Sequence, residues 1–476
     1  MAPPEAFVES VLNRTSGQSY CSPSGQIGDS CCDFETVESI SNALHPQLIE
    51  LVQTPFFSHY KIDLFKGCPF WKDNFVCVQK DCAVETVDES MVPEAWRSAR
   101  LSAVDFTPQP RGMFDIPKQC APSDKDFCFL EDEGSEKGAY VNLLRNPERF
   151  TGYAGPSSTQ IWKAIYEENC FDLVKQLGAG DEAHSSEDSD DSSLDTDTDQ
   201  EDSSAPLASA SGSLNQTPDI LEQNMEKRVF YRIISGLHAS ISVHICDEYF
   251  YRDRGEWGPN LDCFVSRIGR YPERLQNIYF NYVLLLRAIT KLSPYLGTYD
   301  FCSGEAAEEV KIRTLVKEMV STSLACPATF DEKVMFSSPH AKLLKDDFKN
   351  HFRNISRIMD CVGCEKCRLW GKMQVSGVGT ALKILFSYEE DSFKSPKPQK
   401  LLQQTEIVAL FNTFARLSES LRAVDHFRTM YQERMAKFRE QEEWERTHPL
   451  EVKAMQYWES FSRWMRRQLT FRSVEL

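Results

Sequence analysis

The sequence lacks several features that define common functional classes. Its formal net charge is −18 at pH 7, so it has no basic surplus of the kind that binds nucleic-acid phosphates. No stretch of about 18 apolar residues occurs, which argues against a membrane-spanning helix. No Gly-x-Gly-x-x-Gly follows a strand-like pattern, so a Rossmann nucleotide site is not expected. These absences leave an acidic globular protein without nucleic acid as a partner.

Basic and apolar residues are missing together from one long internal stretch. Residues 181–205 contain eleven Asp and Glu residues and no Lys or Arg. Such a composition cannot bury enough apolar surface to fold, so we predict a disordered acidic insert at 181–218.

The N-terminus has neither a basic n-region nor an apolar h-region. We therefore expect that a signal peptide, in a secretory protein, has been removed.

Cysteine, by contrast, is abundant, with 16 residues in 476. No zinc-ribbon or zinc-finger spacing repeats along the chain. Scattered cysteines at this density favour disulfides and an oxidising compartment. Three Asn-x-Ser/Thr sequons, at Asn13, Asn215 and Asn354, agree weakly with a glycoprotein.

Apolar periodicity predicts a mainly α protein with a single helical domain and a bundle core. The expected helices are 36–66, a segment around 158–166, 222–250, 273–291, 305–323, 340–360, 364–386 and 401–440. The run from Leu275 to Leu286 is apolar nearly all round, which is typical of a buried central helix. We divide the chain into a disulfide-held cap at 1–35, the domain at 36–440 with an irregular, disulfide-stapled segment at 67–135, and a tail at 441–476.

The tail is basic and amphipathic. It combines Trp458, Phe461 and Trp464 with Arg463, Arg466 and Arg467. A helix of this kind can lie on a membrane surface. It can equally dock on the protein itself or on a partner, and the sequence leaves both interpretations open.

Three cysteines stand three residues apart in CVGCEKC, residues 361–367. A tetrahedral zinc or iron–sulfur site needs a fourth ligand, and position 371 is glycine, so we expect no metal. A structural ring closed over three residues constrains the unfolded chain little, whereas Cys-x-x-Cys rings are typical of redox catalysts. We therefore favour Cys364–Cys367 as a reactive pair, with Lys366 and Arg368 adding positive charge. Such a dithiol needs a cofactor to accept its electrons.

Four blocks of the sequence together resemble the endoplasmic reticulum oxidoreductins. They are CVGCxxCRLWGK with GTALK at 361–383, CPFW with C-x4-C-AV at 68–84, NPERFTGY at 146–153 followed by Trp162, and ISGLHAS at 234–240. The resemblance covers residues from about 20 to 440, apart from the acidic insert. It implies a FAD-dependent thiol oxidase that oxidises protein disulfide isomerase in the endoplasmic reticulum lumen, with FAD held inside the helical bundle.

The resemblance also implies a set of flavin contacts. Matched one by one, they are Arg149, Thr151, Trp162, Ser235, His238, Arg274 and Arg287. Arginine forks suit a pyrophosphate, and an indole offers a stacking face. Each residue has a structural alternative: Trp162 could belong to the core, His238 could be a structural histidine, and Arg287 could pair with a buried acid.

A relay of two cysteine pairs follows from the same resemblance. Cys77–Cys82 is expected to be a shuttle pair that receives electrons from isomerase thiols and reduces the inner pair Cys364–Cys367. The inner pair would pass the electrons through FAD to molecular oxygen, giving hydrogen peroxide. We expect Cys364 to face the shuttle and Cys367 to face the flavin.

Further disulfides are implied by analogy with the family. Cys68–Cys361 matches a long-range bond, and Cys128–Cys302 is a candidate regulatory clamp of the fungal type. Residues 83–92 contain no cysteine, unlike animal members, which favours the fungal scheme. Pairing stays open for Cys21, Cys31, Cys32, Cys120, Cys170, Cys246, Cys263 and Cys326. An alternative from a different functional class is a secreted, disulfide-rich binding protein without catalytic activity.

Overall fold

The structure is a computed structural model. It describes residues 34–64, 66–70, 138–148, 156–168, 225–251, 253–299, 301, 306–323, 332–337, 339–394 and 401–472. Several expectations fall outside these residues: the N-terminal cap, the acidic insert, and the side chains of Cys77, Cys82, Cys128, Cys302, Arg149 and Thr151.

The described residues form a mainly α domain, as the sequence predicts. Its helices are α2 (Phe34–Val52), α3 (Pro55–Ser58), α5 (Pro156–Glu167), α8 (Met225–Asp247), α9 (Leu261–Phe264), α10 (Pro272–Thr298), α11 (Ala306–Ser323), α12 (Pro339–Ile358), α13 (Glu365–Ser387), α14 (Gln404–Thr447) and α15 (Pro449–Arg472). Short helical turns are η5 (Val265–Gly269, a π-helix), η6 (Glu332–Val334), η7 (Met359–Cys361) and η8 (Glu390–Phe393).

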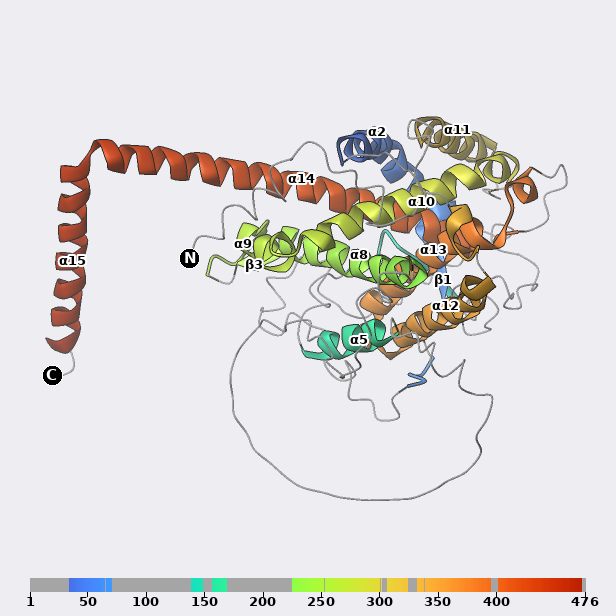
Figure 1. Ribbon diagram of the computed structural model, residues 1–476, viewed down its shortest axis with the longest axis horizontal. Coiled ribbons are helices and arrows are strands. Elements are labelled where there is room, and N and C mark those ends of the chain that lie inside the picture. The colour runs from blue at the N-terminus through green and yellow to red at the C-terminus, as the bar shows by residue number, and fades with distance from the viewer. Residues whose placement is uncertain are drawn as a thin grey trace, which may run out of the picture.

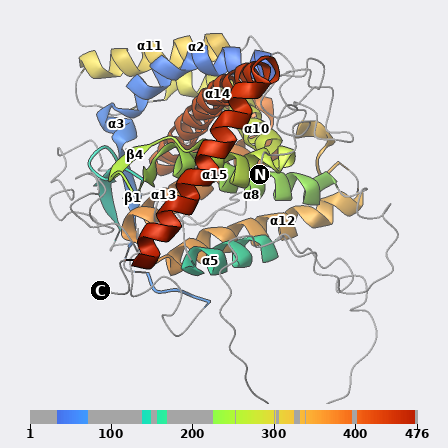
Figure 2. The same cartoon turned by 90° about the vertical axis from the view of Figure 1, so that its left-hand side faces the viewer.

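The helices pack in layers around α10, α13 and the first half of α14. Helices α2 and α11 lie side by side on one side of the bundle, and α5 and α12 lie side by side on the opposite side (Figure 1 and Figure 2). Helix α10 is buried over most of its length, from Leu275 to Leu296, which confirms the prediction of a central apolar helix. The core is continuous and reaches into every layer.

Two glycines allow the central helices to approach each other closely. A Cβ on Gly377 of α13 would overlap the Thr413 side chain of α14. A Cβ on Gly236 of α8 would overlap the backbone oxygen of Asn277 on α10. Because any side chain there would separate the helices, these positions need glycine for packing rather than for a special backbone conformation.

The predicted helix over 36–66 is wrong in its second half. Helix α2 ends at Val52, because Thr54 is extended (ψ 153°) before Pro55, as residues that precede proline usually are. The chain then forms β1 (His59–Ile62), which pairs antiparallel with β2 (Ala139–Asn142). A second hairpin joins β3 (Tyr249–Tyr251) to β4 (Glu256–Gly258). Strands of three or four residues give too little alternation to be predicted from sequence.

Helix α8 is the one described helix that is long and apolar enough to span a membrane by length and composition. However, 83% of its most apolar window is buried inside the protein, so packing accounts for its hydropathy. The C-terminal region, in contrast to α8, extends away from the bundle. Helix α14 continues beyond the bundle to Thr447, and α15 turns away from its end (Figure 1).

Candidate functional site

The inner cysteine pair lies at the start of α13. Cys364 and Cys367 are joined by a disulfide, and their exposed fractions are 1% and 0%. Cys364 is the N-cap of α13, and the backbone N–H of Cys367 donates to its Sγ at 3.2 Å. A helix N-terminus favours negative charge, so this position stabilises a thiolate on Cys364 once the disulfide is opened.

A second disulfide and an arginine fasten the turn before α13. Cys361 is bonded to Cys68, the pairing that the family resemblance implies. Arg368 donates from Nε to the carbonyl of Val362 at 2.8 Å and from Nη1 to the carbonyl of Leu64 at 2.7 Å. The segment that leaves β1 is thus held against the inner pair by one covalent bond and one charged side chain.

An apolar cavity opens beside α13, between α5, α8 and α12. Its walls are made by Ser158, Ile161, Trp162, Ile165, Ile234, Leu237, Ile241, Phe352, Ile355, Met359, Val362, Gly371, Gln374 and Val375. Gly371 and Gln374 follow Cys367 by four and seven residues, so the three share one face of the helix. The cavity therefore continues the helix face that carries Cys367.

Trp162 in the cavity wall belongs to a cluster of three rings. The indole of Trp162 on α5 stacks on the imidazole of His238 on α8, with ring centroids 4.0 Å apart. The hydroxyl of Tyr166 lies 3.0 Å from Nδ1 of His238. Burial, together with the charges of Arg274 and Arg267, lowers the pKa of His238 to about 3. His238 is therefore neutral at physiological pH and serves as a flat ring rather than a cation.

Two arginines lie close enough to these rings for their charges to act on His238. Arg274 on α10 donates from Nη1 to the backbone carbonyl of Arg267 in η5 at 2.6 Å. Burial and the charge of Arg274 lower the pKa of Arg267. Within the described part of the chain, no carboxylate forms an ion pair with either. Two neighbouring half-buried cations with no carboxylate partner among the described residues suit an anionic group.

Ser235 also belongs to this region. It lies on α8 one turn before His238, is 2% exposed, and accepts a hydrogen bond from Nδ2 of Asn277 at 3.0 Å. The structure thus brings together four of the flavin contacts that the resemblance implies: Trp162, Ser235, His238 and Arg274.

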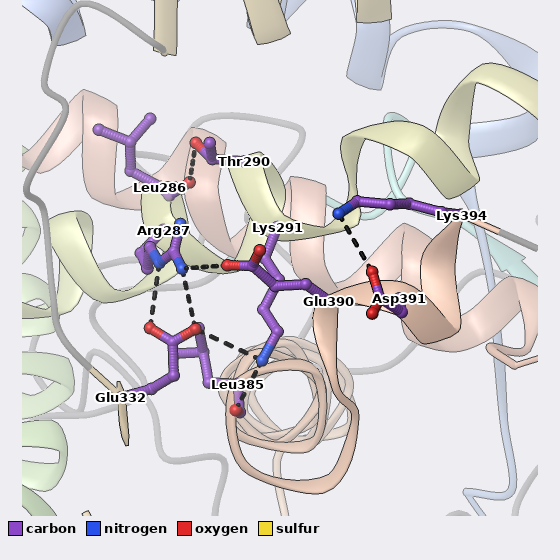
Figure 3. A network of polar contacts seen from close by, with 9 residues as sticks. All are labelled: Leu286, Arg287, Thr290, Lys291, Glu332, Leu385, Glu390, Asp391 and Lys394. Carbon is purple, nitrogen blue, oxygen red and sulfur yellow. Dashed lines mark hydrogen bonds and ion pairs between the residues drawn. The ribbon is translucent and has the colours of Figure 1, made fainter. Parts of the chain in front are cut away.

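Arg287 does not belong to this group. It lies thirteen residues after Arg274, which along a helix is a rise of about 20 Å and a rotation of about 220°. Its guanidinium binds Glu332 through Nε and Nη2, at 3.1 and 2.9 Å, and Nη2 also contacts Glu390 at 3.2 Å (Figure 3). Lys291 completes the network, 3.4 Å from Glu332. The structure thus places Arg287 in an ion-pair network, which is the structural alternative that the sequence left open for this residue.

Sequence reasoning missed Arg267, which lies beside Arg274. Its position gave no signal, because the π-helical turn Val265–Gly269 has neither α-helical nor strand periodicity. Sequence reasoning also left Cys246 and Cys263 unassigned. The structure joins them, which ties the end of α8 to α9, four residues before Arg267.

Among the described residues, no three His, Cys, Asp or Glu side chains gather in a ligand set. The inner pair, the apolar cavity and the cation pair instead suit a redox dithiol beside an aromatic anionic cofactor.

Known proteins of one family are similar to this chain. Residues 43–424 match the family model of Endoplasmic Reticulum Oxidoreductin 1 (ERO1). The chain is 41% identical to endoplasmic reticulum oxidoreductin-1 of Neurospora crassa, over 87% of this chain and 69% of the relative. It is 38% identical to ERO1-like protein alpha of Rattus norvegicus, over 87% and 92%.

Solved structures give the same result. A mutant of S. cerevisiae Ero1p superimposes with a TM-score of 0.60 at 29% identity, covering 85% of this chain and 99% of that chain. The structure of Ero1p described as the source of disulfide bonds for oxidative protein folding in the cell gives 0.58 at 30% identity, with the same coverage. The chain belongs to the endoplasmic reticulum oxidoreductins and is a thiol oxidase of oxidative protein folding.

Proposed function

We propose that this enzyme uses FAD to oxidise protein disulfide isomerase in the lumen of the endoplasmic reticulum, with molecular oxygen as the final acceptor and hydrogen peroxide as the product. One observation carries the proposal: the helix face that bears Cys367 continues into the apolar cavity at Gly371 and Gln374. An aromatic ring in that cavity would lie beside a dithiol.

The residues present fit a flavin dinucleotide. The apolar walls suit the ring system, and the rings of Trp162 and His238 offer stacking faces. Arg267 and Arg274 would hold the pyrophosphate, because its negative charges would neutralise the two arginine side chains. Arg149 and Thr151 stay in the proposed set on the resemblance alone. When bound, FAD supplies a two-electron acceptor that a dithiol can reduce and that oxygen can reoxidise.

On the protein side, we propose two successive thiol–disulfide exchanges. A thiolate of the reduced isomerase attacks the Cys77–Cys82 disulfide, and the second isomerase thiol resolves the mixed disulfide, which leaves the isomerase oxidised and the shuttle reduced. A shuttle thiolate then attacks Cys364 and displaces Cys367 as a thiolate. The second shuttle thiol attacks the mixed disulfide in turn, so two electrons reach the inner pair.

The surroundings of the two inner sulfurs support different roles for them. Cys364 caps the helix and is adjacent to the turn that Cys68 and Arg368 fasten, so it is the sulfur for attack by the shuttle. Cys367 lies on the helix face that continues into the cavity wall, so it is the sulfur that faces the cofactor. This assignment makes Cys367 the leaving group of the first attack.

Two further features of the proposal concern regulation and location. We propose that the Cys128–Cys302 bond restrains the shuttle segment and that its reduction raises activity; an unchanged activation lag after Cys128→Ala would contradict this.

We also propose that α15 contacts the luminal membrane face, because its large apolar side chains are exposed: Leu450, Met455, Tyr457, Trp458, Phe461, Trp464 and Met465. Loss of vesicle binding in Trp458→Glu would support this contact.

The decisive experiment measures cofactor and turnover on the same preparation. The purified protein should show the absorbance bands of a bound flavin, at about 370 and 450 nm. Oxygen uptake with reduced isomerase should fall to background in Cys364→Ala, while the flavin bands remain. A colourless protein would instead point to a non-catalytic binding protein, and undiminished uptake in Cys364→Ala would remove the inner pair from the mechanism.

A further inference from the structure

Gln374 is a polar side chain in an otherwise apolar wall. It lies on α13 seven residues after Cys367 and is 3% exposed. Among the described residues that line the cavity, only Gln374, Ser158 and Trp162 have a nitrogen or oxygen atom in the side chain. A buried amide costs free energy unless both of its ends are hydrogen-bonded, so its presence here needs an explanation.

One end of the Gln374 amide is fixed by the protein. Its Nε2 donates to Oε1 of Glu148 at 2.8 Å. Glu148 is 1% exposed, and its Oε2 lies 3.0 Å from Nε of Arg416 on α14. Arg416 in turn lies over the indole of Trp370, 5.0 Å from the ring centroid.

This anchoring decides which way the amide points. Because the Glu148 carboxylate lies against the Arg416 guanidinium and a carboxylate is an acceptor only, the NH2 group of Gln374 must face it. The carbonyl oxygen Oε1 then points away from Glu148. It makes no hydrogen bond with any of the described residues. An oriented acceptor beside the cavity therefore has no partner within the described protein.

We propose that Gln374 is the residue that orients the flavin ring, by accepting a hydrogen bond at Oε1 from the ring's imide N–H. The oxidised isoalloxazine has a single N–H donor, at N3, and the other polar atoms of its ring system are acceptors. Glu148 and Arg416 act as positioning residues that keep the acceptor turned toward the cavity. The inference rests on the proposed FAD cofactor and adds a ring-recognition residue to it.

A ligand lacking the donor tests the inference directly. The full chain is equilibrated with equal concentrations of FAD and N3-methyl-FAD, and the bound ratio is measured by chromatography of the released flavins. Wild type should prefer FAD about tenfold, as expected for one buried hydrogen bond whose loss leaves an acceptor unpaired. Gln374→Met keeps the side-chain volume and removes the acceptor, so its ratio should approach one.

The design separates hydrogen bonding from crowding by the added methyl group. If N3-methyl-FAD were excluded only by size, Gln374→Met would keep the tenfold preference, and the inference would be overturned. Gln404→Met is a matched control, because Gln404 is a buried glutamine at the start of α14 away from the cavity wall; it should keep the wild-type ratio. Glu148→Gln should weaken the preference, since the amide is no longer held in one orientation.

The outcomes also distinguish this inference from the proposed function. A wild-type protein that binds neither flavin removes the cofactor itself. A wild-type protein that binds both flavins equally keeps the proposed function and removes the role of Gln374. If Glu148→Gln kept the full preference for FAD while Gln374→Met lost it, only the positioning role of Glu148 would be removed.

Discussion

Nη1 of Arg368 donates to the backbone carbonyl of Leu64 at 2.7 Å, across 304 residues of sequence. Leu64 follows β1 and precedes Cys68 by four residues, while Arg368 directly follows Cys367. The same guanidinium donates to the carbonyl of Val362. Arg368 thus ties the segment that leads toward the shuttle pair to the turn of the inner pair. The sequence suggested only that it adds positive charge.

Replacing Arg368 should impair turnover with the isomerase. In Arg368→Ala the two carbonyls lose a charged donor, which should lower the free energy of unfolding by about 2 kcal/mol. We expect about a tenfold lower kcat for oxygen uptake with reduced isomerase, because the segment that leaves β1 is then held against the inner pair by the Cys68–Cys361 bond alone. Arg368→Lys should restore stability better than turnover, since an ammonium cannot span the fork geometry. Arg439→Ala, on the exposed part of α14, is the control, and equal kcat in all variants would contradict the role.

Arg267 and Arg287 should respond oppositely to the same substitution. Arg267→Gln removes one of the two unpaired cations, and we expect FAD to dissociate at least tenfold faster, measured by recovery of flavin fluorescence. Arg287→Gln should leave that rate unchanged. It should instead lower the free energy of unfolding by about 3 kcal/mol, because Glu332 stays buried without its main partner. Faster flavin release in Arg287→Gln would return Arg287 to the site.

The Cys246–Cys263 disulfide should stabilise both the fold and the cation pair. It closes a loop with a sequence separation of 17 residues, a length for which loop entropy gives about 3 kcal/mol. Denaturant unfolding of Cys246→Ala/Cys263→Ala should show a loss of that order. Because Cys263 lies in α9 directly before η5, flavin release should also accelerate. A destabilised variant with wild-type flavin release would restrict the bond to a structural role.

Glu248 should make stability decline as pH rises. Burial raises its pKa to about 8, with Arg416 opposing and Asp247 adding to the shift. An acid whose folded pKa lies above its unfolded value binds more protons in the native state, so stability is full below about pH 4.5 and is lost progressively up to pH 8. Glu248→Gln should remove this part of the decline, so its advantage in thermal midpoint over wild type should grow from pH 5 to pH 9. A gap that does not change with pH would contradict the assignment.

Elements that depend on local pattern were predictable. The central helix α10, the long α14 and the start of α13 follow from apolar periodicity and from the short spacing of Cys364 and Cys367, which a helix places within bonding distance. The boundaries of the elements were predicted less well: the segment after Pro55 was predicted as helix and is partly strand. A four-residue strand exists only because a partner 80 residues away supplies its hydrogen bonds.

By itself, the sequence determined the helical class and the family, and it predicted a redox role for the inner pair. Tertiary structure decided the partners of the arginines: Arg287 stands in an apolar run, yet it pairs with Glu332, while Arg267 stands in a turn without periodicity and lies beside Arg274. It also decided the direction of the Gln374 amide, through Glu148. The physical reason is common to both. A buried charge or amide is placed by its partner, and those partners come from segments that no local pattern links.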